Sequence, residues 1–150
     1  VSRAIVESGL RPEHLTLEIT EDILMSNVAG ALDALTALRR LGVRLAVDDF
    51  GTGYSSLSHL SRLPIDSLKI DRSFVHQLHR NSDDAAVVAA IVQLGSTLRK
   101  AVVAEGIETA DQMTQLRELG CEGGQGFNLA KPLSEQAAGE WLAARRRQLH

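Results

Sequence analysis

Apolar positions along the chain form two alternating patterns, which predict a repeated strand–helix unit. Short runs of aliphatic and β-branched residues end in polar side chains, and each is followed by apolar positions at helical spacing. The expected strands are 15–20, 44–50, 67–71, 101–105 and a weak one at 124–127. The expected helices are 27–41, 55–63, 83–100, 109–119 and one from 132 to the run Arg145–Arg147.

Several helix ends are marked by residues with capping roles. Gly42 and Gly120 stand where a left-handed residue ends a helix, and Pro64 stops the short helix before it. Thr109 and Gln112 have the spacing of a capping box. The chain starts at Val1 in a stretch that looks helical, so we expect a piece of a longer protein.

The repeated unit predicts an α/β fold with a parallel sheet and helical crossovers. Two architectures have this pattern: a doubly wound open sheet and a (β/α)8 barrel of the TIM type. A complete barrel typically needs about 250 residues, whereas this chain has 150. A barrel would therefore be present only in part, as about five of its eight units.

Composition and charge exclude several classes of protein. A net charge of −3 with 44% hydrophobic and 23% charged residues is ordinary for a globular domain. The mild acidity and the few aromatic residues argue against a nucleic-acid polymer as partner. The single cysteine, Cys121, excludes an internal disulfide and a thiolate metal site. No apolar run approaches the ~20 residues of a membrane span.

Polar side chains gather where each expected strand ends. In chain order they are Glu18 and Glu21, Asp48 and Asp49, Lys69 and Asp71, Glu105 and Glu108, and Gln125. In a parallel barrel these strand ends share one face, where active sites of this fold are built. The alternative is that each strand merely ends in solvent, but five consecutive occurrences favour a site.

Carboxylates dominate this set and predict a site for hard divalent cations. Oxygen ligands without histidine or cysteine favour Mg²⁺ or Mn²⁺ over Zn²⁺. Asp48 and Asp49 would point to opposite sides of a regular strand, so the chain must bend there, as Gly51 and Gly53 permit. A two-metal site suits hydrolysis of a phosphodiester. Lys69 would then orient water or stabilise phosphoryl charge; alternatively it is only salt-bridged to one of the acids.

Six segments resemble the EAL-domain family of cyclic-di-GMP phosphodiesterases. They are Leu17–Glu21, Asp48–Ser56, Leu68–Asp71, Val103–Thr109, Gln125–Phe127 and Lys131–Leu133. Their order and spacing match the family across essentially the whole chain, and the run DDFGTGYSS at Asp48–Ser56 is highly specific.

The resemblance implies a modified (β/α)8 barrel, with residues 1–150 forming the C-terminal part of one EAL domain, about its last five βα units. It implies a cytoplasmic bacterial signalling enzyme, in a parent that can be membrane-anchored, which hydrolyses cyclic di-GMP to linear pGpG with Mg²⁺ or Mn²⁺, as two ions. The implied partners are cyclic di-GMP, a second copy bound through the loop after Asp49 and the following helix, and an upstream GGDEF or sensor domain.

The resemblance also implies a role for each polar residue. The implied metal-site residues are Glu18, Asp48, Asp49 and Glu105; Lys69 contacts the catalytic water and Glu105 is also catalytic; Gln125 binds substrate; Glu21 anchors the DDFGTGYSS loop; Glu108 and Asp71 are supporting acids.

The chain departs from the family pattern in what it lacks. The Glu-Ala-Leu motif and a metal-binding Asn of the family belong to early strands that are absent here, so we expect this chain alone to be inactive. Glu122, Gly123 and Gly124 replace bulkier residues, which should loosen the last strand. One alternative function is a non-catalytic module that binds cyclic di-GMP or a protein. Another is a different metal-dependent barrel enzyme, of the aldolase or enolase type, which the loop sequence disfavours.

Overall fold

Five parallel strands form a single sheet in the computed structural model, which describes residues 1–53, 57–78 and 82–146. In spatial order the strands are β1 (Thr16–Thr20), β2 (Arg44–Phe50), β3 (Ser67–Ile70), β4 (Ala101–Ala104) and β5 (Gly123–Gly124). Each strand pairs with its neighbour in sequence, with no reversal of order. This is the order of a βα-barrel wall and excludes the doubly wound sheet, in which the order reverses at a switch point.

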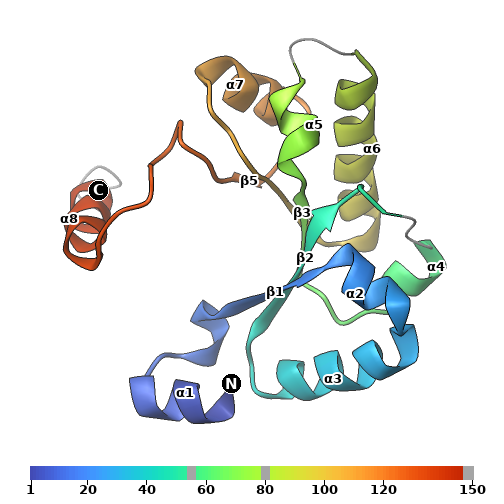
Figure 1. Cartoon of the computed structure of the whole chain (residues 1–150), viewed down its shortest axis with the longest axis vertical. Helices are drawn as coiled ribbons and strands as arrows, with labels where there is room; N and C mark the ends of the chain where they lie inside the picture. The colour runs from blue at the N-terminus through green and yellow to red at the C-terminus, as the bar shows by residue number, and fades with distance from the viewer. Residues whose placement is uncertain (54–56, 79–81, 147–150) are drawn as a thin grey trace.

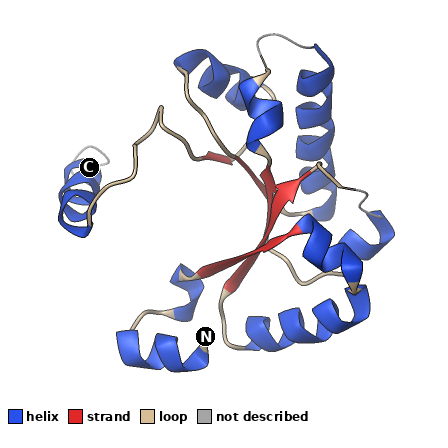
Figure 2. Cartoon of the chain, in the orientation of Figure 1, coloured by secondary structure: helices blue, strands red, loops and turns tan. Residues whose placement is uncertain are grey.

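Helices cover one side of this sheet (Figures 1 and 2). In chain order they are α1 (Ser2–Ser8), the 3₁₀ turn η1 (Pro12–His14), α2 (Glu21–Ser26), α3 (Val28–Arg40), α4 (Leu57–Leu60), α5 (Arg72–His76), α6 (Ser82–Leu98), α7 (Ala110–Glu118) and α8 (Glu135–Arg146). Helices α2 to α7 lie along the covered side, whereas α1 and α8 lie beyond the two edges of the sheet. None of the described helices is long and apolar enough to span a bilayer.

Most expected elements are present, with small shifts at their ends. Strand β2 has the expected bounds, and the capping box of Thr109 and Gln112 opens α7. Gly42 and Gly120 both have a φ of 86°, the left-handed conformation expected of them. The fifth strand is shorter and earlier than expected, ending at Gly124. Of the helix expected at 55–63, residues 55 and 56 lie outside the described part, and α4 ends at Leu60.

The two faces of the sheet differ in polarity because strand side chains alternate between them. The face under the helices is apolar and fully buried; its residues include Leu45, Val47, Leu68, Ile70, Val102 and Ala104. The opposite face lines a hollow of about 560 Å³, bordered by residues that include Thr16, Glu18, Arg44, Ala46, Ser67, Lys69 and Val103. Burial of the apolar face stabilises the packing of the sheet against its helices. The opposite face carries the polar side chains.

Strand β2 contains an irregularity at its carboxyl end. Val47 pairs with Leu68 and Phe50 with Ile70, so Asp48 and Asp49 together stand opposite one residue of β3. This is a β-bulge, in which one extra residue bends the strand. The φ of Asp49 is 53°, so the bend expected here lies at Asp49 itself, and not only at the glycines that follow.

Asp66, just before β3, forms hydrogen bonds to the amino ends of β2 and β4. Its replacement should therefore destabilise the sheet. Its carboxylate accepts hydrogen bonds from the Leu45 amide at 2.9 Å and the Arg39 guanidinium at 3.0 Å. Its own carbonyl accepts from the Ala101 amide. Replacing Asp66 with Ala leaves the Leu45 amide without this acceptor, so we expect the free energy of unfolding in urea to fall by about 1–3 kcal/mol.

The matched control is Asp66→Asn, which keeps an oxygen for the Leu45 amide and loses only the charge. The ion pair with Arg39 is substantially exposed, and such pairs contribute about 0–1 kcal/mol. The Asn variant should therefore retain most of the stability that the Ala variant loses. An equal loss in both variants would show that the charge matters more than the hydrogen bond.

Candidate functional site

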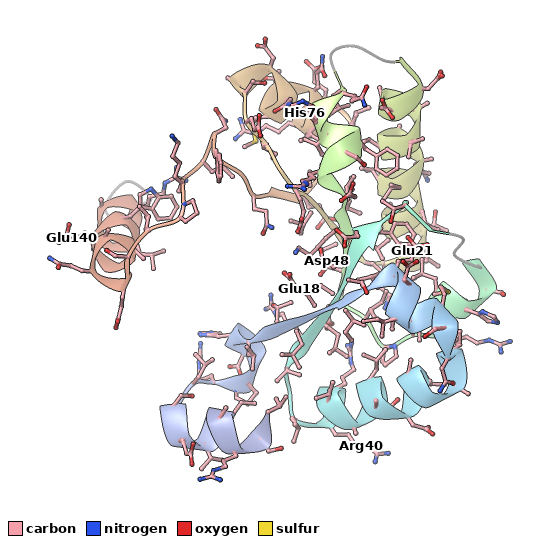
Figure 3. All side chains as sticks on the ribbon, viewed as in Figure 1. Glu18, Glu21, Arg40, Asp48, His76 and Glu140 are labelled. Atoms are coloured by element: carbon pink, nitrogen blue, oxygen red, sulfur yellow. The ribbon has the colours of Figure 1, made fainter. Side chains whose placement is uncertain are left out.

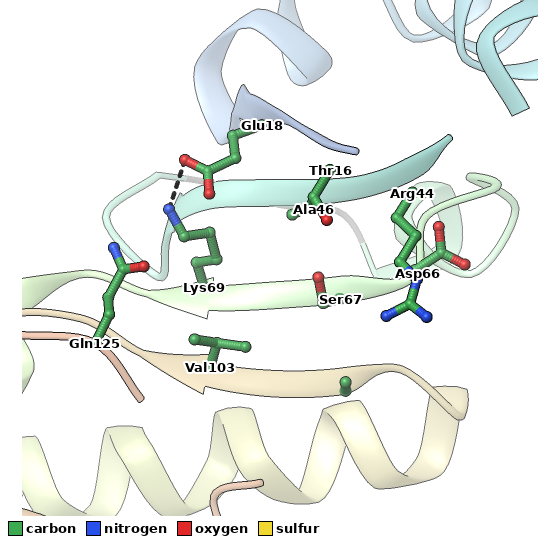
Figure 4. Close-up of a pocket in the computed structure, with 10 residues that line it drawn as sticks. Thr16, Glu18, Arg44, Ala46, Asp66, Ser67, Lys69, Val103 and Gln125 are labelled. Atoms are coloured by element: carbon green, nitrogen blue, oxygen red, sulfur yellow. Dashed lines mark ion pairs between the residues drawn. The ribbon is translucent and has the colours of Figure 1, made fainter. Parts of the chain in front are cut away.

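The Lys69 ammonium forms ion pairs with three carboxylates on the polar face of the sheet. Figure 3 labels Glu18 and Asp48 of this group, and Figure 4 shows the ion pair of Lys69 with Glu18. Lys69 Nζ is 2.6 Å from Glu18 Oε2 and 3.0 Å from Asp48 Oδ1, and it also forms an ion pair with Glu105. Lys69 is 5% exposed. The alternative interpretation, a salt bridge to one acid, therefore understates its contacts, because Lys69 pairs with three.

Strand register brings these four side chains together. Thr20 pairs with Asp48, and the alternation along β1, β2 and β3 places Glu18, Asp48 and Lys69 on the same face. Glu105 follows the last residue of β4, and its amide donates to the Ile70 carbonyl at 3.2 Å. The group is thus built at the carboxyl ends of four neighbouring strands, as the sequence predicts.

Charge coupling shifts the pKa values in this group. Burial alone would lower the pKa of Lys69, but its contacts with the carboxylates of Glu105, Glu18 and Asp48 outweigh burial and raise it. Burial raises the pKa of Glu105, and repulsion from Asp48 and Glu18 adds to this against the opposing effect of Lys69. Lys69 therefore stays charged, and Glu105 binds a proton more readily than an ordinary glutamate does.

The three carboxylates fit a divalent cation. One oxygen from each of Glu18, Asp48 and Glu105 lies within 4.8 Å of the others. Asp48 Oδ1 is buried and accepts no well-aligned hydrogen bond, although Lys69 Nζ is 3.0 Å away. A buried carboxylate oxygen without a full set of partners, in an all-oxygen donor set, suits a hard cation such as Mg²⁺ or Mn²⁺.

A second acidic group adjoins the first and shares Glu105 with it. Asp49, Thr52, Asp71, Arg72 and Glu105 border a hollow of about 510 Å³. Burial raises the pKa of Asp49, and repulsion from Asp48 and Asp71 raises it further. For Asp71, burial opposes ionisation, but hydrogen bonds from the Ser73 hydroxyl and amide outweigh it and lower the pKa.

Two further residues from the sequence analysis lie next to these groups. Gln125 Nε2 donates to Glu105 Oε1 at 2.9 Å, so Gln125 holds that carboxylate from the β5 side. Glu21 is 2% exposed, and its Oε2 accepts from the Gly51 amide at 2.9 Å. A Cβ on Gly53 would lie 3.0 Å from Glu21 Oε1, so the chain after Asp49 passes closely over this buried carboxylate.

Glu108 is the expected site residue that the structure does not bring into either group. The chain turns at Gly106, whose φ is 68°, and Glu108 then borders a separate hollow together with residues of α5. Its side chain is 54% exposed, and its Oε2 lies 3.9 Å from Nδ1 of His76. Conversely, Thr52 and Arg72 border the second hollow and were not expected there. The signal for Arg72 is its place directly after Asp71.

Known proteins share this sequence and fold. The family model described as the EAL domain matches residues 1–132. The bifunctional diguanylate cyclase/cyclic di-GMP phosphodiesterase MucR of Pseudomonas aeruginosa is 50% identical over 133 residues, which are 89% of this chain and 19% of MucR. The cyclic di-GMP phosphodiesterase NbdA of the same organism is 46% identical over 146 residues, 97% of this chain and 19% of NbdA. The chain thus spans about a fifth of the length of these relatives.

Solved structures show the same arrangement. The MucR phosphodiesterase in complex with c-di-GMP superposes with a TM-score of 0.88 at 48% identity, covering 91% of this chain and 55% of that one. The EAL domain of DcpA from Mycobacterium smegmatis also gives 0.88, at 41% identity, with 95% and 64% covered. The manganese and c-di-GMP complex of BlrP1 from Klebsiella pneumoniae gives 0.78 at 37% identity, with 84% and 32% covered. These matches confirm a barrel-type α/β fold, present here in part.

Proposed function

Because this chain belongs to the EAL domain family, we propose that the domain containing it hydrolyses cyclic di-GMP to linear pGpG. The observation that carries this proposal is the buried Lys69 ammonium among Glu18, Asp48 and Glu105, which unites a cation with carboxylate donors at parallel strand ends. Two relatives, MucR and NbdA, are named as cyclic di-GMP phosphodiesterases, which supports the same substrate here.

We assign the divalent ions to the two acidic groups. Glu18, Asp48 and Glu105 would hold one Mg²⁺ or Mn²⁺, and Asp49 with the shared Glu105 would help to hold a second. When bound, the ions supply positive charge that polarises the phosphodiester and promotes ionisation of the attacking water. The manganese complex of BlrP1 supports this choice of metal.

The residues of this chain would orient the water and take its proton. Once the ions take up the carboxylates, one of the three N–H donors of Lys69 would hold the water against phosphorus. The oxygen of the water would form a bond to phosphorus while the phosphorus–oxygen ester bond opposite breaks. The leaving sugar oxygen would take up a proton from solvent, and the ring would open to the linear dinucleotide. Glu105 would accept a proton from the water. Gln125 would keep Glu105 in place and border the bound nucleotide.

The surrounding protein is part of the same proposal. We infer that strands carrying the Glu-Ala-Leu motif complete the barrel, since the solved MucR chain is covered only to 55%. The chain alone, as residues 1–150, would then show no measurable turnover. We further propose a cytoplasmic domain with an upstream GGDEF or sensor domain, which dimerises through the loop after Asp49 and the following helix. Residues 54–56 of that loop lie outside the described residues.

Hydrolysis by the complete EAL domain tests the proposal. The domain is incubated with cyclic di-GMP and Mn²⁺, and pGpG is separated by chromatography. Removing the proposed proton acceptor in Glu105→Ala should lower the rate by a factor of about 10²–10⁴. Glu118→Gln, at an exposed position of α7, should leave the rate unchanged. No product together with retained nucleotide binding would instead identify a non-catalytic binding module.

A further inference from the structure

Arg72 lies at the edge of the site, and its guanidinium has no ionic partner among the described residues. Its side chain is exposed and forms no hydrogen bond or ion pair with any described residue. By contrast, Lys69 forms ion pairs with three carboxylates of the acidic groups. The guanidinium of Arg72 is therefore available to a ligand.

The backbone fixes the direction in which Arg72 leaves the chain. Asp71 caps α5 by accepting a hydrogen bond from the Ser73 amide at 2.9 Å, which holds Arg72 at the first position of the helix. Gly106 packs against the base of the side chain, since a Cβ there would lie 2.7 Å from Arg72 Cβ. Arg72 consequently borders two hollows, the acidic one beside Asp49 and a smaller one beside His76 and Glu108.

The two acidic groups are so negative that binding of an anionic dinucleotide would be helped by a further cation. Glu18, Asp48, Asp49, Asp71 and Glu105 with Lys69 carry a formal charge of −4, which two divalent ions would only neutralise. A cyclic dinucleotide brings two negatively charged phosphodiesters. Groups whose net charge is zero would attract neither of them. An arginine at the rim supplies the missing attraction, because a guanidinium can donate two parallel hydrogen bonds to a phosphate.

We propose that Arg72 binds a phosphate oxygen of the bound dinucleotide and so sets the affinity for substrate. This inference rests on the proposed function, because it takes cyclic di-GMP as the ligand. Arg72 is not among the residues assigned to the ions or to the proton transfer. Its loss should therefore weaken binding and raise KM, while kcat changes little.

Equilibrium binding of cyclic di-GMP to the complete EAL domain provides the test. Calorimetric titration with Ca²⁺ as the divalent ion gives Kd, and chromatography of the sample afterwards shows whether the nucleotide is intact. Replacing Arg72 with Gln should raise Kd about 10- to 100-fold, the range for a hydrogen bond between charged groups. Arg72→Lys keeps the charge but lacks the paired donors, so its Kd should lie between those of the wild type and Arg72→Gln.

Salt dependence separates a phosphate contact from a structural role. A direct contact between charges is screened by ions, so the wild-type Kd should rise more steeply with NaCl than the Kd of Arg72→Gln. The control is Arg117→Gln, which removes the same charge from an exposed position of α7 that borders neither hollow. It should leave both Kd and its salt dependence unchanged.

The outcomes distinguish this inference from the function on which it rests. If the wild-type domain neither binds nor hydrolyses cyclic di-GMP, the proposed function fails. If the wild-type domain binds and Arg72→Gln has the same Kd and salt dependence, the role of Arg72 is wrong and the function stands. A fall in kcat at unchanged KM would likewise overturn the assignment, because it would place Arg72 in the chemical step.

Discussion

Replacing Lys69 with Met should lower the stability of the metal-free protein by about 3–5 kcal/mol, as expected when one partner of a buried ion pair is removed. The three carboxylates of Glu18, Asp48 and Glu105 would then face one another without the ammonium that now lies among them. A divalent cation can restore the missing charge. Mn²⁺ should therefore raise the melting temperature of the variant far more than that of the wild type.

Thermal unfolding in chelator and in Mn²⁺ measures both effects on the same sample. Lys100→Met is the matched control, because the Lys100 ammonium is part-buried but donates to a backbone carbonyl, that of Ile65. Its loss should reduce stability without creating a dependence on Mn²⁺. If Lys69→Met is as stable as the wild type in chelator, the ammonium does not hold the carboxylates together in the metal-free protein.

Replacing Gly126 with Ala should destabilise the fold by about 3 kcal/mol or more, in the range of mutations that force atoms to overlap in the core. A Cβ at this position would overlap the backbone nitrogen and oxygen of Ile107. Those atoms are already engaged, since the Ile107 amide donates to the Gln125 carbonyl and the Ile107 carbonyl accepts from the Asn128 amide. The segment must therefore move, and Gln125 would lose its position against Glu105.

Two measurements distinguish the overall loss of stability in Gly126→Ala from the local opening of the hydrogen bonds to Ile107. Urea unfolding gives the loss of stability, and hydrogen exchange at Ile107 and Asn128 reports whether their hydrogen bonds have opened. Gly139→Ala in α8 is the control, because a Cβ there meets no atom within 4 Å. It should leave stability unchanged or slightly raise it, as alanine favours a helix by about 1 kcal/mol over glycine. Equal stability of Gly126→Ala and wild type would mean that the 125–128 segment is free to shift.

The repeat of strands and helices was predictable because it depends on local pattern. Strand β2 has its expected bounds since an aliphatic run lies between Gly42 and the polar aspartates. Helices α2 and α5 could not be foreseen, because six and five residues are too few to show helical periodicity. The fifth strand ends early because the chain after Gly124 turns to pair with Ile107, a contact distant in sequence.

The site was predictable as a set of strand ends but not in its internal pairing. Glu18, Asp48, Lys69 and Glu105 meet because parallel strands bring their carboxyl ends to one edge, which the sequence implies. That Lys69 contacts three acids at once depends on register and side-chain conformation, which the sequence does not encode locally. Glu108 lies elsewhere because the left-handed turn at Gly106 redirects the chain after Glu105.

Because of the bulge in β2, the candidate metal-site residue Asp49 is not needed for the packing of the strand against the helices. Val47 and Phe50 are both buried against the helices, at 0% and 4% exposure, while Asp48 pairs with Lys69 on the opposite face of the sheet. A strand without Asp49 would alternate in perfect step from Val47 through Asp48 to Phe50. Asp49 is thus an insertion into an otherwise regular strand, in a backbone conformation that costs about 1–3 kcal/mol. The hydrophobic pattern that closes the sheet on its helices has no need of this residue, so a chain could gain or lose its second aspartate without redesigning the core.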